Sequence, residues 1–239
     1  MESIEADVID GLFPRPDASR VLRRALALSA VVCRGFMENQ EDRSFAVDLH
    51  GRVVTWIEQF GIRDELEADE LAMILAPVGT LDRQQTVNGT WRSEGLAVLA
   101  WALGKFPLPR HDDTVVPVEA AESVGFLGDS PVELAALRPE SEIDAMEQHL
   151  LALHWRLRDF RLRPVAMDFV EFVRNCRWAE LSVDPEALVE GDLCIDGFRI
   201  DRADPERVRE CGSIAQERHQ AINWLIGDNP IYSQVETNT

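Results

Sequence analysis

The chain has 239 residues, 46% of them hydrophobic, which is enough to bury a sizeable core in one large domain or two small ones. Its 43 acidic and 24 basic residues give a net charge of −19. This excess argues against nucleic acid or an anionic membrane as the main partner, because both need a basic surface. It is compatible with a basic protein partner, although plain solubility is the simpler explanation.

The four cysteines are widely spaced, with no CxxC pair, and the first ten residues are acidic and contain no apolar run. Without a signal-peptide pattern, we expect a reduced, cytoplasmic protein with free thiols. Lys105 is the single lysine, and this bias toward arginine is typical of GC-rich bacterial genomes.

The N-terminal residues 1–17 are predicted to form a flexible lead, because Pro14 and Pro16 interrupt regular structure. Ser19 can cap the first helix, which we expect over residues 19–39.

Two further helices are expected at 44–60 and 64–76, followed by an additional turn at 82–85. The first of these ends at Gly61, as helices often do. Its spacing of apolar residues predicts a buried stripe that consists of Val47, Val54, Ile57 and Phe60.

The stretch 88–104 predicts the helix around which the others pack. Residues 95–103 contain no charged or strongly polar side chain, and a helix that is apolar on all sides belongs in the interior of a domain. Asn88 and Thr90 are candidate N-caps, and Gly104 supplies the left-handed residue after the helix. The stretch is too short to cross a bilayer.

Residues 105–129 contain several prolines and no clear period, so a long loop is expected there. Residues 130–133 have the pattern of a capping box, which predicts a short helix. The next long helix is expected at 139–163, where apolar residues recur at every third or fourth position: Ile143, Met146, Leu150, Leu153, Leu157 and Phe160.

Shorter helices are expected at 167–178 and 184–191. Residues 192–201 then change period, and Asp196-Gly197 between two apolar runs predicts a β-hairpin.

The last helix is expected to begin at Asp204-Pro205 and to end at Gly227. No repeat or linker divides the chain. The predicted fold is therefore mainly α, with a single helical domain at 18–227 around the buried central helix, one small hairpin, and a polar tail at 228–239.

Three runs carry a resemblance to a known family. They are WRSEGLAVLAWALG at 91–104, HWRLRD at 154–159 and ERHQAINWL at 217–225. They resemble the blocks W-R-x-E…WALG, H-W-x-x-R/D and E-R-H-x-A-L-N-W-L of domain-of-unknown-function family 4272, with Ile222 where leucine is usual. The resemblance covers roughly residues 20–239. It implies an intracellular, mainly bacterial protein and supplies no activity.

Polar side chains interrupt the apolar stripes of the expected helices. Glu94 lies in the stripe of the central helix and Arg218 in that of the last one, and a buried charge needs a partner. We therefore predict that Glu94 or Arg92 pairs with Arg218 or Glu217 out of water. The candidate polar cluster consists of Arg92, Glu94, His154, Arg156, Asp159, Glu217, Arg218, His219 and Asn223.

This cluster has two interpretations, an ionic clamp that joins three helices or the floor of a small-molecule pocket, and the clamp is favoured. No metal is expected, because His149 and His154 are five residues apart and cannot chelate one ion as an i, i+4 pair would. No cofactor is expected either, since GxSxG, P-loop, GxGxxG and HExxH motifs are missing from the sequence.

Two classes of function remain open. The favoured one is a non-catalytic, acidic interaction protein, similar to an immunity protein or antitoxin, that binds a basic protein partner. The alternative is a small-molecule-binding protein or an unrecognised enzyme that uses the polar cluster. A solvent-filled cavity against the cluster would favour the alternative, and a dry, fully paired cluster would favour the interaction protein. The sequence gives no oligomeric state.

Overall fold

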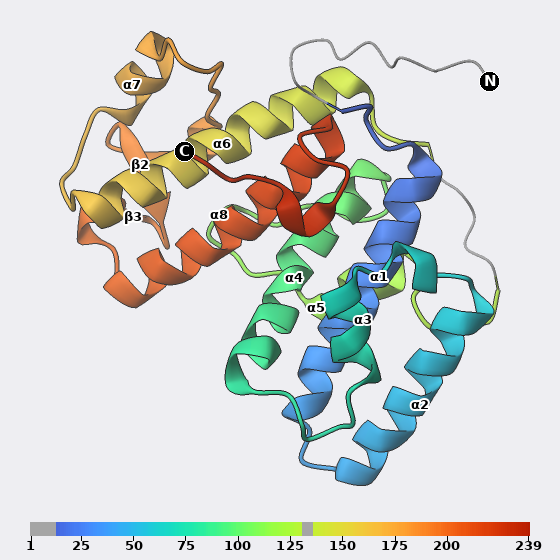
Figure 1. The fold of residues 1–239 in the computed structure, drawn as a ribbon. Coiled ribbons are helices and arrows are strands. Elements are labelled where there is room, and N and C mark those ends of the chain that lie inside the picture. The colour runs from blue at the N-terminus through green and yellow to red at the C-terminus, as the bar shows by residue number, and fades with distance from the viewer. Residues whose placement is uncertain (1–12, 131–135) are drawn as a thin grey trace, which may run out of the picture.

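The computed structural model describes residues 13–130 and 136–239, which form a mainly α-helical fold with one small antiparallel sheet, as predicted (Figure 1). The α-helices are α1 (Ala18–Glu38), α2 (Arg43–Gln59), α3 (Ala68–Leu75), α4 (Arg83–Ala102), α5 (Pro117–Ser123), α6 (Glu140–Leu162), α7 (Phe169–Asn175) and α8 (Pro205–Ile226). The strands are β1 (Leu188–Val189), β2 (Asp192–Ile195) and β3 (Phe198–Arg199). None of the helices in these two ranges combines the length and the apolar character that crossing a membrane requires.

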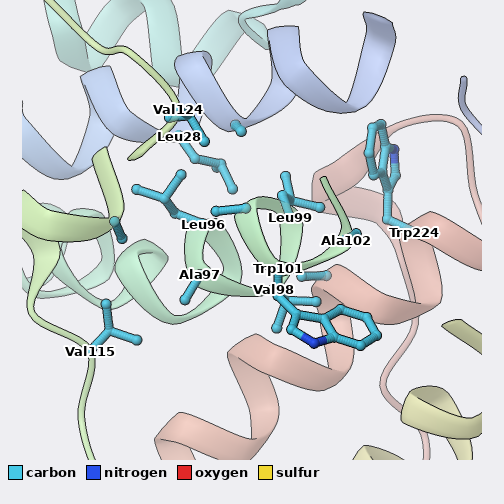
Figure 2. Packing of buried hydrophobic residues seen from close by; sticks show 14 of the residues in the cluster. Leu28, Leu96, Ala97, Val98, Leu99, Trp101, Ala102, Val115, Val124 and Trp224 are labelled. Atoms are coloured by element: carbon cyan, nitrogen blue, oxygen red, sulfur yellow. The ribbon is translucent and has the colours of Figure 1, made fainter. Parts of the chain in front are cut away.

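Helix α4 is the buried central helix that the sequence predicts. It packs against α1 on one side and α8 on another, and every residue of 95–102 is buried. In Figure 2, Leu96 and Leu99 point toward Leu28 of α1, whereas Val98 and Trp101 point away from it. An apolar surface on all sides is what a helix needs when neighbours cover it all round.

The start of α4 differs from the prediction. Asp82 accepts a hydrogen bond from the backbone N–H of Gln85 at 2.7 Å, and the Gln85 side chain accepts one from the N–H of Asp82 at 3.0 Å. This capping box places the N-terminus at 82–85, so Asn88 and Thr90 lie inside the helix and are not caps. Gly104, with φ of 66°, follows the helix end as expected.

Three expectations for the N-terminal helices are corrected. The cap of α1 is Asp17 rather than Ser19, because the Asp17 carboxylate accepts from the N–H of Arg20. In α2 the predicted stripe is right only in part. Ile57 is buried, and Val54 and Phe60 are partly buried against the core, but Val47 is 58% exposed. The other buried residues of α2 are Ala46, Val53 and Trp56. The expected helix at 64–76 is split into a 3-10 turn (Arg63–Glu65) and α3, which Glu67 caps.

The predicted loop at 105–129 contains a short helix, α5, which begins with Pro117 at its first position. Proline is tolerated there because the first N–H groups of a helix have no partner within the helix. The helix predicted after residue 130 lies outside the described residues. Helix α6 matches its prediction to within one residue at each end.

The predicted hairpin is confirmed and belongs to a three-stranded meander in the order β1-β2-β3. Cys194 faces Arg199 across the hairpin. Asp196 and Gly197 have φ values of 52° and 82°, as a type I′ turn requires. The turn before β2 repeats this geometry at Glu190 and Gly191, with φ of 49° and 79°. A strand therefore replaces part of the helix predicted at 184–191, since only a 3-10 turn (Pro185–Ala187) precedes β1.

Helix α8 begins at the predicted Asp204 cap and ends at Gly227, whose φ is 91°. The residues after it pack back onto the core. Tyr232 is 2% exposed, its ring contacts Trp224, and its carbonyl accepts from the Gln220 amide at 2.8 Å. The segment 228–239, which was predicted as a polar tail, therefore contributes to the hydrophobic core.

Candidate functional site

The polar residues singled out from the sequence lie in three separate groups rather than in one cluster. The first group joins α4 to α8, the second joins α6 to β2, and the third joins α6 to α8. The groups are Arg92, Glu94, Glu217 and Arg218; Arg156 and Asp159 with Asp192; and His154 with His219.

The predicted pairing between α4 and α8 is confirmed. Arg218 lies 2.8 Å from the Oε2 atom of Glu94, and both side chains are 1% exposed. The guanidinium also donates to the carbonyls of Pro109, Arg110 and Asp113 at 2.8 to 3.0 Å. These bonds fasten the segment 109–113 to α8.

Both carboxylate oxygens of Glu94 also have hydrogen-bond partners. Its second oxygen, Oε1, accepts from the backbone N–H of Val115 at 2.9 Å. A buried ion pair is tolerated when additional hydrogen bonds satisfy the remaining polar atoms, and this pair has them on both sides. Glu94 and Arg218 therefore have a structural role, because their hydrogen bonds link α4, α8 and the segment 109–115.

A second ion pair between the same helices is closer to solvent. Arg92 Nη1 lies 3.0 Å from Glu217 Oε2 and 2.8 Å from Gln220 Oε1, and the side chains of Arg92 and Glu217 are 24% and 15% exposed. Burial is the largest single influence on Arg92 and lowers its pKa, but the charge and hydrogen bond of Glu217, together with Tyr232 and Glu70, outweigh burial and raise the pKa. Arg92 therefore stays a cation and cannot exchange protons near neutral pH.

The group around Arg156 anchors the sheet to α6. Arg156 and Asp192 are both completely buried and form two hydrogen bonds of 2.7 Å each. Asp192 also accepts from the N–H groups of Leu193 and Met167 at 2.8 and 3.0 Å. Asp159 is a weaker partner of Arg156, at 3.1 Å. Asp192 was not among the predicted residues, although it is the one acidic side chain that opens an otherwise apolar strand.

The two histidines of the third group form a buried pair. The Nδ1 atoms of His154 and His219 are 2.9 Å apart, and the residues are 4% and 1% exposed. Burial is the main cause that lowers the pKa of His154 to about 3 and that of His219 to about 4. Both rings are therefore neutral at pH 7, one as the Nδ1–H donor and the other as the acceptor.

Asn223 belongs to none of these groups. Its amide donates to the carbonyl of Glu236 at 2.9 Å and so fixes the C-terminal segment. The predicted convergence of nine residues is wrong because helices longer than 20 residues carry their polar side chains at different heights along the axis.

Two clefts adjoin these groups. The first, which we call the α4–α6 cleft, has a volume of about 860 Å³ and is lined by Trp101, His111, Arg138, His149 and Arg218 among others. Both of its histidines are anchored to the backbone: the His111 Nε2 atom lies 2.5 Å from the Cys194 carbonyl oxygen, and the His149 Nδ1 atom accepts from the N–H of Asp184 at 3.4 Å. Burial lowers the pKa of both histidines.

The second cleft, which we call the α6–α8 cleft, lies where these two helices run side by side (Figure 1). Its volume is about 880 Å³. His154 lies in its wall, and Arg158, Arg161 and Arg209 line it. These three arginines are not among the residues predicted from the sequence, because arginines are common in this chain and no motif distinguishes them.

Within residues 13–130 and 136–239, no group of three or more His, Cys, Asp or Glu side chains is placed to hold a metal ion. The linings of the two clefts combine arginines, carboxylates, other hydrogen-bonding groups and apolar side chains.

The comparisons with known proteins give one match. The family described as Domain of unknown function (DUF4272) matches residues 14–174. This range includes the first two of the three sequence runs, and the run at 217–225 lies beyond it. No curated protein and no solved structure matches the chain. Because the match covers more than half of the sequence, the chain belongs to the domain-of-unknown-function family DUF4272.

Proposed function

We propose that this protein is a non-catalytic binding protein that docks a basic protein partner on an acidic and apolar part of its surface. The observation that supports this most directly is the pairing of Glu94 and Arg218. Glu94 and Arg218, the two charges within the apolar stripes, have their hydrogen-bonding atoms occupied by the protein itself, so they are not free to bind or activate a substrate.

The neutral histidine pair supports the same conclusion. A general base at neutral pH works best with a pKa near 7. With pKa values of about 3 and 4, His154 and His219 are bases too weak to accept a proton near neutral pH.

The docking surface that we propose comprises residues 40–48, at the start of α2. Every residue in this range except Ala46 is exposed. Phe45 and Val47 are 49% and 58% exposed, and Glu41 and Asp48 are exposed beside them. An exposed aromatic residue in a segment that carries three carboxylates and one arginine suits a partner that offers an apolar side chain within a basic patch. The net charge of −19 would speed the encounter with such a partner.

The test measures binding of a fluorescent, amphipathic peptide of lysine and leucine to the full chain by anisotropy, at low and at physiological salt. The variant carries Phe45→Ser, Val47→Ser and Asp48→Lys. The matched control carries Val116→Ser, Val118→Ser and Glu119→Lys at α5, where both valines are also exposed, and it changes the net charge by the same amount.

We expect the α2 variant to bind at least about tenfold more weakly than the wild type, and the control to stay within about twofold. Equal weakening of both variants would show that only the overall charge attracts the peptide, and it would refute a docking surface at α2. Loss of all binding at physiological salt in the wild type would refute the proposal as a whole.

A second candidate function, the binding of a small molecule, is favoured by one observation: the α6–α8 cleft is lined by arginines although the protein as a whole is strongly acidic.

A further inference from the structure

Two arginines of the α6–α8 cleft, Arg158 and Arg161, carry charges that no described carboxylate neutralises. No carboxylate among residues 13–130 and 136–239 lies within 4.0 Å of the guanidinium of Arg158 or Arg161. The acidic neighbour on the same helix, Asp159, is paired with Arg156 and Arg163 instead. Arg158 donates one hydrogen bond, of 3.2 Å, to the carbonyl of Thr237.

The other charged residues of the cleft do not supply a counter-charge to Arg158 and Arg161. Arg209 is 3.6 Å from Glu206, but the two side chains are 65% and 88% exposed, so solvent screens the contact. Asp201 also lines the cleft, and Arg199 holds it in two hydrogen bonds of 2.6 and 2.9 Å.

The fully buried arginines differ from those of the cleft, of which Arg158 is half-buried and Arg161 and Arg209 are exposed. Each of the four whose side chains are at most 1% exposed contacts a carboxylate; the pairs are Arg24 with Glu70, Arg34 with Glu38, Arg156 with Asp192, and Arg218 with Glu94. Each of these buried arginines therefore has a counter-charge within the fold. Arg158 and Arg161 have none among the described residues, although the protein has 19 negative charges in excess.

The positive charges of the cleft arginines also act on the histidine pair in the wall of the cleft. After burial and His219, the causes that lower the pKa of His154 are Arg158 and Arg161, and Arg158 also lowers that of His219. No nearby carboxylate is among the causes that act on these two rings. An anion in the cleft would therefore meet uncompensated positive charge beside a neutral imidazole.

From this arrangement we infer that the α6–α8 cleft binds a small organic anion, with its phosphate or carboxylate group on Arg158, Arg161 and Arg209. Guanidinium groups bind both kinds of oxyanion through paired N–H donors. This site is independent of the surface proposed at α2 and goes beyond it.

The rest of the cleft indicates what the remainder of the ligand is like. Its volume of about 880 Å³ is in the range of small-molecule sites. Leu157, Phe160 and Val208 form an apolar part of the lining, and Ser213 and Gln216 add hydrogen-bonding groups. A ligand with a ring or a short hydrocarbon next to its anionic group would use both parts.

The structure offers a way to block the cleft without removing a charge. Gly212 of α8 lines it, and a Cβ atom at this position would meet no other atom within 4 Å. Gly212→Phe would therefore fill the space that the ligand needs. Gly51, inside α2, has equally open surroundings, so Gly51→Phe is the matched control.

The experiment is calorimetric titration of the full chain with phenyl phosphate, benzoate and the uncharged phenol. We expect at least one of the two anions to bind and phenol not to bind. Arg158→Gln with Arg161→Gln should weaken the binding at least about tenfold, whereas Arg52→Gln with Arg83→Gln, at exposed positions elsewhere, should change it less than about twofold. Gly212→Phe should abolish binding and Gly51→Phe should preserve it.

The choice between phenyl phosphate and benzoate identifies the anionic group. Failure of both anions to bind at concentrations up to about 1 mM would overturn the inference, as would binding of phenol as strongly as the anions. Binding that survives both the arginine substitutions and Gly212→Phe would overturn it as well, because the anion would then lie elsewhere.

Discussion

Replacing Arg218 with methionine tests the buried link between α4 and α8. Methionine keeps most of the apolar stem of arginine but provides no donor. The substitution leaves the Glu94 carboxylate, which is 1% exposed, without its cation, and it removes the donor from three backbone carbonyls of the segment 109–113.

The magnitude follows from these losses. Breaking a buried pair by removing one partner costs about 3–5 kcal/mol, and each carbonyl that loses its donor and finds no water adds on the order of 1 kcal/mol. With the three carbonyls included, we expect Arg218→Met to lower the free energy of unfolding by about 6–8 kcal/mol, which is a large share of the roughly 5–15 kcal/mol that is usual for a folded domain. Glu94→Gln should cost about 3 kcal/mol.

The assay is urea unfolding followed by far-UV circular dichroism, for the wild type, both single variants and the double variant. The double variant should be more stable than the sum of the single effects predicts, by about 2 kcal/mol, because each single change strands the other partner. Arg92→Met is the control. Its pair with Glu217 is partly exposed, so the loss should be about 1 kcal/mol.

A loss below about 1 kcal/mol for Arg218→Met would show that the ion pair is hydrated in solution, and it would refute a buried link between α4 and α8. Purely additive effects in the double variant would have the same meaning for the coupling between Glu94 and Arg218.

Three further predictions concern other parts of the molecule. Because burial lowers the pKa of His219 to about 4, below its ordinary 6.5, the folded protein binds this proton less readily than the unfolded chain does, and stability should fall as the pH drops from 7 toward 4. The loss for this residue is about 2 kcal/mol at pH 5, and His219→Gln should flatten the wild-type dependence in urea titrations at pH 7 and 5; an unchanged slope would contradict it. Gly95→Ala should lower the melting temperature by several degrees, because the new Cβ would lie 2.3 Å from the Tyr232 hydroxyl, and Tyr232→Phe should restore it, since that hydroxyl has no hydrogen-bond partner in the described residues. Gly197→Val should cost about 1–2 kcal/mol in thermal unfolding, because φ is 82° there, and a variant as stable as the wild type would exclude the type I′ turn.

The features that the sequence predicted well are those with local causes. The apolar run of α4, the Asp204 cap of α8 and the Asp196-Gly197 turn each depend on a few adjacent residues. The link between Glu94 and Arg218 was also predictable, because each helix has a charge of opposite sign in its apolar stripe, and a buried charge requires a partner.

The features that were missed depend on the three-dimensional arrangement. Val47 has the spacing of a core residue, but α2 turns a different face to its neighbours. Asp192 follows a glycine turn, and only the folded chain places it against Arg156 on α6. Arg158 is notable because no carboxylate of residues 13–130 and 136–239 lies within 4.0 Å of its guanidinium, and the sequence does not show which side chains the fold brings near it.

Helix α8 has a consequence for how the chain reaches its native state. It supplies the partner of Glu94, which is 124 residues away in sequence, and that of His154, which is 65 residues away. Both loops must close before either polar group can leave water, and closing long loops slows folding. Docking of α8 is therefore expected late on the folding pathway. Before α8 docks, Glu94 and His154 remain exposed to water on the helices that α8 will cover. During this time the partly folded chain is vulnerable to proteases and to aggregation.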